Sequence, residues 1–358
     1  MLEDRSFEVI VERLLEGARE QFPELDTREG SLIYSALAPA AMEMSRLYTA
    51  LQFALEMSFA DTASREFLVR RAAERGMGPF EATPALIEAA VLPEEMQLPV
   101  GSRFRAGAVI YAVSGRSGAG FHLLTAESPG VVGNISGGRL VPVGFIEGLR
   151  SAAIRALLVP GRDVEDTEAF RRRYVESHRN QSFGGNIAAY REKVLAIAGV
   201  GGVRVFPAPE GPGTVGVVIL GADYGTPSAA LIDAVQEVLD PRQVTGEGRG
   251  WAPIGHQVTV TGAQALSVAV SAVLTLESGA DSQVVTGLVR AEIEAYLLGL
   301  RMAWDRGEAL VVRLSQIDTR LLDVAGVLDV ADTTLNGQRR NLVLEERQVP
   351  LFGGLMLL

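Results

Sequence analysis

The side chains that most often do chemistry in proteins are scarce in this chain of 358 residues. It contains no cysteine, which excludes disulfides, thiol catalysis and thiolate metal sites. Its three histidines, His122, His178 and His256, stand far apart and show no metal-ligand spacing, so we interpret them as ordinary surface or core residues. Lys193, the single lysine, lies in a helical pattern and is interpreted as part of a solvated helix face.

Residues 211–216, with the sequence GPGTVG, match the glycine pattern G-x-G-x-x-G. A dinucleotide site needs a strand before this pattern and a helix N-terminus after it. Here the glycines lead into the strand-like run 217–220, so we predict a hairpin turn. The chain has no phosphate-binding loop with a G-K-[ST] ending and no G-x-S-x-G nucleophile elbow.

Acidic residues at 163–168 precede arginines at 171–173, which is the nearest approach in the sequence to an acid–base or metal cluster. The simpler interpretation is electrostatic, because carboxylates in a first helical turn and later arginines both complement the helix dipole. Pairs such as Glu168–Arg172 are expected along this helix. The segment Gly184-Gly185-Asn186 is interpreted as a turn that ends in a helix N-cap rather than as a phosphate cradle.

Composition narrows the class of protein further. The net charge of −11 argues against a protein whose main role is binding nucleic acid, because phosphate neutralisation needs a basic surface. The sequence contains no run of 18 apolar residues, the length needed for a helix that spans a bilayer. The first residues lack the pattern of a signal peptide. We therefore expect a soluble cytosolic protein with two or three domains.

The first 80 residues predict helices. An amphipathic pattern covers residues 5–20, and a second helix is expected from about residue 31 or 40 to 60, where Pro39 should either start it or kink it. Ser31 is positioned as its N-cap. A third helix is expected over 66–75, ending at Gly76. Three such helices could close a bundle alone or leave an apolar stripe for the helix of a partner.

The rest of the chain predicts a fold of the α+β class. Short apolar runs broken by glycine and proline indicate a small β domain over residues 81–160. Helices and strands then alternate, which predicts mixed α/β domains at 161–255 and 256–358. The expected strand regions include 104–113 in the β domain and 257–277 later in the chain. Together with the N-terminal helical segment 1–80, these make four predicted parts.

Two apolar regions are the candidate interaction surfaces. One is the stripe on the N-terminal helices, and the other is the last eight residues, 351–358, which we expect to be covered by the chain's own domain or by a neighbouring subunit. The candidate interaction residues are Leu14, Met44, Leu47, Leu51, Phe59, Phe352, Leu355 and Leu358.

Several of these segments resemble the baseplate J-like protein family through the order and spacing of many weak motifs. The segments that carry the resemblance are Asp26–Ser31, Thr62-Ala63 with Phe67-Leu68, Gly76, Ala82-Thr83, Pro99 and Gly101, Gly133-Asn134, Gly161, Asp166, Phe170-Arg171, Gly184-Gly185-Asn186, Tyr190, Gly199-Val200, Ala252–Gly255, and Asn336-Gly337 with Asn341. The chain departs from the pattern at Arg65, Val69 and Pro79.

This resemblance implies a structural wedge protein of a contractile tail or injection particle. It also implies that the protein binds no cofactor and catalyses no reaction. It implies helix bundling with other wedge proteins at the N-terminus and lateral self-association of the C-terminal domains around a central hub. No nucleic acid, membrane, metal or small-molecule partner is expected. The implied location is the bacterial cytoplasm during assembly and then the particle itself. A tail-associated hydrolase and a hub or adaptor component remain the alternatives, and the type of particle and its copy number stay open.

Overall fold

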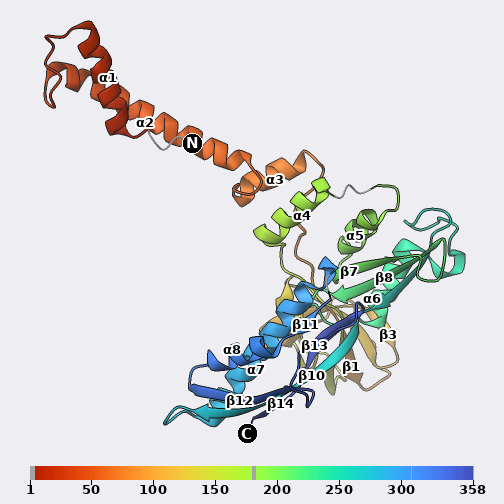
Figure 1. The fold of residues 1–358 in the computed structure, drawn as a ribbon. Coiled ribbons are helices and arrows are strands. Elements are labelled where there is room, and N and C mark those ends of the chain that lie inside the picture. The colour runs from red at the N-terminus through yellow and green to blue at the C-terminus, as the bar shows by residue number, and fades with distance from the viewer. Residues whose placement is uncertain (1–4, 180–182, 308, 358) are drawn as a thin grey trace. The chain divides into compact units, whose positions relative to one another are not determined.

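A computed structural model describes residues 5–179, 183–307 and 309–357 (Figure 1). The chain divides into two compact units, each of which is described by itself. The first comprises Met1–Pro79 together with Glu165–Arg179, and the second comprises Phe80–Val164 together with Asn180–Leu358. Helices, strands and several separate sheets are all present, so the α+β class predicted from the sequence is confirmed.

The first unit begins with a pair of helices, α1 (Phe7–Gln21) and α2 (Leu32–Ser58). Ser6 and Ser31 cap them, and each side-chain hydroxyl accepts a hydrogen bond from a backbone N–H three residues later. Pro39 lies inside α2, so the alternative start at residue 40 is wrong. A small core of Ile10, Val11, Leu15 and Ala41 joins the two helices.

The third predicted helix, α3 (Arg65–Ala73), does not close a bundle with the first two. It contacts α2 through the edge-to-face pair of Phe53 and Phe67, and it shares a core with α4 (Thr167–Arg179), which follows it by almost a hundred residues in the chain. Leu68 and Phe170, both fully buried, form the centre of their shared core.

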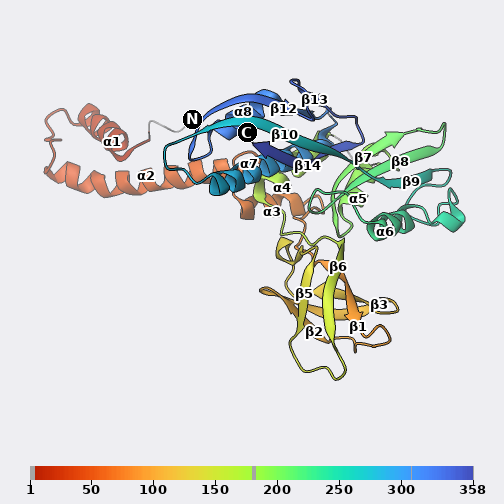
Figure 2. The ribbon, with the colours of Figure 1, turned by 90° about the horizontal axis from the view of Figure 1, so that it is seen from below.

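The second unit contains a closed barrel of six strands, in the order β1-β4-β3-β2-β5-β6 (Figure 2). The strands are β1 (Leu86–Leu92), β2 (Arg103–Ala106), β3 (Val109–Gly118), β4 (Phe121–Ala126), β5 (Gly138–Pro142) and β6 (Ser151–Val159), with a 3-10 turn at Val131–Gly133. The run 104–113, expected as one strand, is a hairpin of β2 and β3. Gly107 adopts φ +58° at its turn, a conformation that glycine reaches without steric cost.

A second sheet in this unit has the order β7-β8-β9, formed by β7 (Val200–Pro207), β8 (Thr214–Gly221) and β9 (Gln257–Gly262). The helices α5 (Ile187–Leu195) and α6 (Ala229–Leu239) accompany it, followed by a 3-10 turn at Arg242–Val244. Its core contains Tyr190, Val217 and Leu231, all almost fully buried.

The C-terminal part is built around a third sheet of β12 (Val327–Leu335), β10 (Gln264–Leu276) and β14 (Gln348–Leu357). It also contains α7 (Ser282–Met302), a 3-10 turn (Trp304–Arg306), α8 (Leu314–Leu322), and the short pair β11 (Val311–Val312) and β13 (Leu342–Val343). The strand region 257–277 is therefore two strands in different sheets, β9 and β10, which separate at the buried Ala263.

Candidate interaction surfaces

The three histidines each have a structural partner. His122 is buried inside the barrel, where its Nε2 accepts a hydrogen bond from the Leu98 N–H at 3.1 Å. His178 contacts the ring of Tyr174 edge to face. Across the described residues, no group of three or more His, Asp or Glu side chains is placed to hold a metal ion.

The third histidine belongs to a hydrogen-bonded pair. The Tyr190 hydroxyl and His256 Nδ1 lie 2.9 Å apart, and the two rings are nearly parallel. Burial, with a smaller contribution from the nearby Asp240 carboxylate, raises the pKa of Tyr190 to about 12. The phenol therefore stays protonated at neutral pH, and the pair fastens the 251–256 loop to α5.

The glycine pattern at 211–216 is a hairpin turn, as predicted. β7 and β8 pair antiparallel on either side of it, and the Gly211 N–H donates to the Ala208 carbonyl within the turn. No helix N-terminus follows the glycines, because β8 begins at Thr214.

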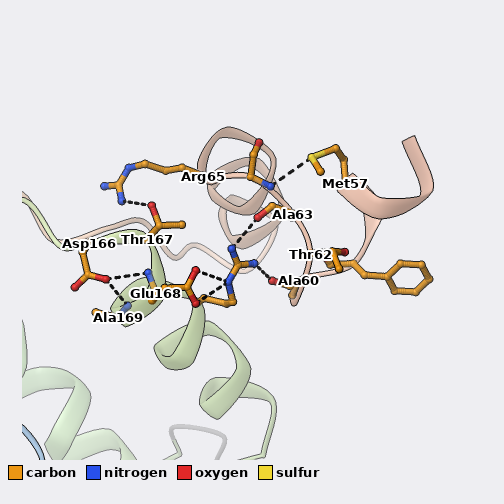
Figure 3. A network of polar contacts seen from close by, with 12 residues as sticks. Met57, Ala60, Thr62, Ala63, Arg65, Asp166, Thr167, Glu168 and Ala169 are labelled. Atoms are coloured by element: carbon orange, nitrogen blue, oxygen red, sulfur yellow. Dashed lines mark hydrogen bonds and ion pairs between the residues drawn. The ribbon is translucent and has the colours of Figure 1, made fainter. Parts of the chain in front are cut away.

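The acidic and basic cluster near residue 166 caps and anchors α4, which confirms the electrostatic interpretation (Figure 3). The Asp166 carboxylate accepts hydrogen bonds from the N–H groups of Glu168 and Ala169, both at 2.9 Å. The ion pair differs from the one expected, because Glu168 pairs with Arg171 at 3.2 Å rather than with Arg172.

Arg171 has a second role in the same network. Its guanidinium donates to the backbone carbonyls of Ala60 and Ala63, in the connection between α2 and α3 (Figure 3). Arg65, at a position where the family resemblance leads one to expect glycine, donates to the Thr167 hydroxyl at 3.3 Å. Arg171 therefore satisfies backbone carbonyls of the α2–α3 connection, and Arg65 bonds a side chain at the start of α4, so both arginines link α4 to the segment around α3.

The motif that precedes α2 also has a structural role. Asp26 accepts hydrogen bonds from the side chain and the backbone N–H of Arg28, and the guanidinium lowers the pKa of the exposed Asp26 carboxyl to about 2. Gly30 adopts φ +88° just before the Ser31 cap. The segment is therefore a turn that fixes the start of α2.

Asparagines of the later motifs bind backbone groups of distant segments. Asn134 forms two hydrogen bonds with the backbone of Gly161, at 2.7 and 2.9 Å. A Cβ at Gly161 would lie only 2.6 Å from the Gly130 carbonyl oxygen, so only glycine fits there. Asn341 accepts a hydrogen bond from the N–H of Leu314 and so caps α8, which lacks a capping side chain of its own.

Helix α2 is the surface that most needs a partner. Only Glu43, Arg46 and Glu56 are charged among its 27 residues, yet only Ala41 is buried. The predicted interaction residues on this helix and at its end are exposed by 40% at Met44, 69% at Leu47, 48% at Leu51 and 60% at Phe59. Helix α1 covers a different face of α2, on which Tyr34, Leu37, Ala41 and Tyr48 lie. Leu14, from α1, is half-buried against this core.

The apolar C-terminus is a strand rather than a free tail. β14 pairs in parallel with β10, and Phe352 and Leu355 pack against the core of the C-terminal part, which matches the alternative in which the tail is covered by its own domain. β14 forms one edge of its sheet, and Met356 is 61% exposed. Leu358 lies outside the described residues. Whether these residues also contact a second subunit stays a prediction.

Comparisons with known proteins agree with the resemblance. Two family models match, the Baseplate J-like central domain at residues 182–262 and the Baseplate J-like protein C-terminal domain at residues 268–358. Two proteins of Bacillus subtilis (strain 168), the phage-like element PBSX protein XkdT and the uncharacterized protein YqbT, are 36% and 37% identical to this chain. Each alignment covers 357 residues, 99% of this chain and 97% of the relative.

A solved structure, the cryo-EM structure of the anti-feeding prophage (AFP) baseplate, aligns with 96% of this chain and 90% of its own chain. Its TM-score is 0.43, and its sequence identity is 12%. On the family models and the Bacillus relatives, the chain belongs to the baseplate J-like family, and it is a baseplate component. None of the described helices is long and apolar enough to cross a membrane.

Proposed function

We propose that the chain is a structural wedge subunit in the baseplate of a phage-like contractile particle. Its uncovered α2 face would dock against helices of other wedge proteins, and its C-terminal part would pair laterally with neighbouring copies to form a ring. The subunit would assemble in the bacterial cytoplasm and remain in the finished particle. In this proposal it acts without catalysis and without a cofactor.

The observation that carries the proposal is the contrast between the composition of α2 and its burial. A helix with so few charges is normally buried against other elements. Here Leu47, Leu51 and Leu55 project from one side of the helix, and all are more than 40% exposed. A contiguous apolar surface of this kind is typical of a protein–protein interface. The Bacillus subtilis relative named as a protein of a phage-like element supports the kind of particle proposed.

The test introduces charges into this face. In the double variant Leu47→Asp/Leu51→Asp, each carboxylate would be buried without a partner in the assembled wedge, at a cost of several kcal/mol. We expect the variant to fold with an unchanged melting temperature and to be absent from particles purified after complementation of a deletion strain.

The matched control is Thr49→Asp/Gln52→Asp, which adds the same two charges at exposed positions of α2 outside the stripe of Leu47, Leu51 and Leu55. It should be incorporated normally. Normal incorporation of the Leu47→Asp/Leu51→Asp variant would show that this face is not an interface.

A further inference from the structure

The outer surface of the barrel carries a concentration of arginine in an otherwise acidic protein. Strands β2, β5 and β6 lie side by side and contain no acidic residue (Figure 2). Outward positions of these strands, together with Val143 directly after β5, form what we call the arginine face. It consists of Arg103, Arg105, Arg139, Val141, Val143 and Arg155, all of them exposed.

Two arginines of this face have carboxylate partners from outside the three strands. Arg103 pairs with Glu127, and Arg155 pairs with Glu88 of β1. In the described part of the chain, neither Arg105 nor Arg139 forms an ion pair.

Arg105 and Arg139 are close neighbours. Arg105 stands directly opposite Val141 in the ladder, and Arg139 precedes Val141 by two residues on the same strand, so both lie on one side of the barrel wall. Diagonal cross-strand neighbours of this kind are about 7–8 Å apart, within reach of long side chains, so one anionic group between them can interact with both guanidinium groups. The pair around Val141 is therefore suited to a carboxylate from another molecule.

The chain itself offers a complementary surface on α1. Four glutamates recur there at intervals of one helical turn, and all four are exposed: Glu8, Glu12, Glu16 and Glu20. Glu12 pairs with Arg19 of the same helix at 2.9 Å, so Glu16 and Glu20 are the more available carboxylates. Residues four apart on a helix have Cβ atoms about 5–6 Å apart, and diagonal cross-strand neighbours lie about 7–8 Å apart. Val9, three residues before Glu12 and 44% exposed, adds an apolar side chain to the same face.

We propose that the arginine face binds helix α1 of a second copy of this chain. Carboxylates of α1, foremost Glu16 and Glu20, would lie against Arg105 and Arg139, and Val9 would pack on Val141 and Val143. This contact goes beyond the proposed wedge function, which assigns no partner to the barrel. It is also separate from the α2 face, so either can fail without the other.

The test uses the absence of cysteine, which leaves no background thiols. Full-length Val9→Cys and full-length Val141→Cys are mixed and oxidised, so a disulfide between the two variants can form only between copies. We expect this hetero-dimer to accumulate at low salt and to decrease at high salt, because surface charge contacts are screened. Thr125→Cys on β4, across the closed barrel from β5, replaces Val141→Cys in the control and should give little product.

Charge exchange then identifies the contact. Arg105→Glu/Arg139→Glu in the Val141→Cys chain should lower the yield at least about tenfold, since opposed like charges cost several kcal/mol. Glu16→Arg/Glu20→Arg in the Val9→Cys chain should do the same, and mixing the two reversed chains should restore the disulfide. The proposal is overturned if the unreversed pair cross-links no better than the Thr125→Cys control, or if the reversed chains together fail to recover the product.

Discussion

Two long helices of this protein, α2 and α7, have similar sequence patterns and opposite surroundings. In α7, Val285, Val289, Ile293 and Leu297 repeat at intervals of four residues, and all four are buried in the C-terminal core. In α2 an equally regular apolar pattern leaves most side chains exposed, although α2 carries fewer charges than α7. Periodicity therefore identifies an apolar face in both helices, but it does not say whether the covering partner belongs to the same chain.

The difference has an energetic consequence. The face of α7 already contributes to the stability of the folded chain, at about 1.5–3 kcal/mol for each large side chain buried. The exposed face of α2 contributes little of this in the free subunit, so its burial free energy is available for assembly. This makes α2 suitable for a contact that forms only when partner subunits are present.

The largest expected effect is the stability difference between equivalent truncations in the two helices. Ile293→Ala should lower the free energy of unfolding by about 2–5 kcal/mol, because Ile293 is fully buried and its loss leaves a cavity. Leu47→Ala should change it by at most about 0.5 kcal/mol, because that side chain is mostly exposed in the free subunit. Urea unfolding of the purified chain measures both.

The comparison fails if Leu47→Ala destabilises the free chain as much as Ile293→Ala does. That result would mean that α2 is already covered in solution. Sedimentation of the same samples would then show whether a second copy supplies the cover.

A smaller effect is expected from removing the N-caps of the two helices. The Ser31 hydroxyl accepts from the Tyr34 N–H at 3.2 Å, and the Asp281 carboxylate accepts from the Gln283 N–H at 2.8 Å. Replacing either residue by alanine should cost about 1 kcal/mol. The cost should appear in different places, because α7 belongs to a large core whereas α2 packs only on the small core that it shares with α1.

Hydrogen exchange separates the two cases. Ser31→Ala should raise exchange in the first turns of α2 with little change in the global melting temperature, since weakly packed elements open locally. Asp281→Ala should instead lower the global stability of the second unit. Equal local fraying in both helices would contradict the contrast between them.

Sequence reasoning located most elements because their signals are local. Ser31 and Asn186 were identified as N-caps from their positions before helical patterns, and both accept the expected backbone hydrogen bonds. The hairpin at Gly107 was missed because alanines flank that glycine instead of the Asn-Gly or Asp-Gly pairs typical of such turns. β14 was missed because Gly353 and Gly354 interrupt its pattern at a bulge.

The contacts between segments far apart in the chain could not be predicted from the sequence, for a physical reason. The packing of Phe170 against Leu68 depends on which apolar faces meet after about a hundred intervening residues, and no local pattern encodes that choice. The same holds for the candidate interaction surfaces. Leu47 and Leu51 were identified as apolar stripe residues, but only the structure shows that α1 covers the other side of α2.

The smallest expected effect is a pH dependence confined to the second unit. Burial, and to a lesser extent the charge of Arg116, lowers the pKa of His122 below its ordinary value of 6.5. Its Nε2 already accepts the Leu98 N–H, and its Nδ1 is buried with no hydrogen-bond partner in the described structure, so a second ring proton would disrupt the site. The unfolded chain binds that proton more readily than the folded chain. The stability that the neutral His122 ring contributes is therefore fully present above about pH 6.5, and it is lost as the pH falls from there through the lowered pKa of the folded chain.

The melting temperature of the second unit should decrease between pH 7 and pH 5. The variant His122→Gln should remove part of this slope, whereas His178→Gln, at an exposed position, should keep it. Residues 5–79 contain no histidine, so hydrogen exchange in α1 and α2, corrected for the intrinsic rate, should not follow this dependence. An unaltered slope in His122→Gln would assign the pH dependence to carboxylates and remove His122 as its source.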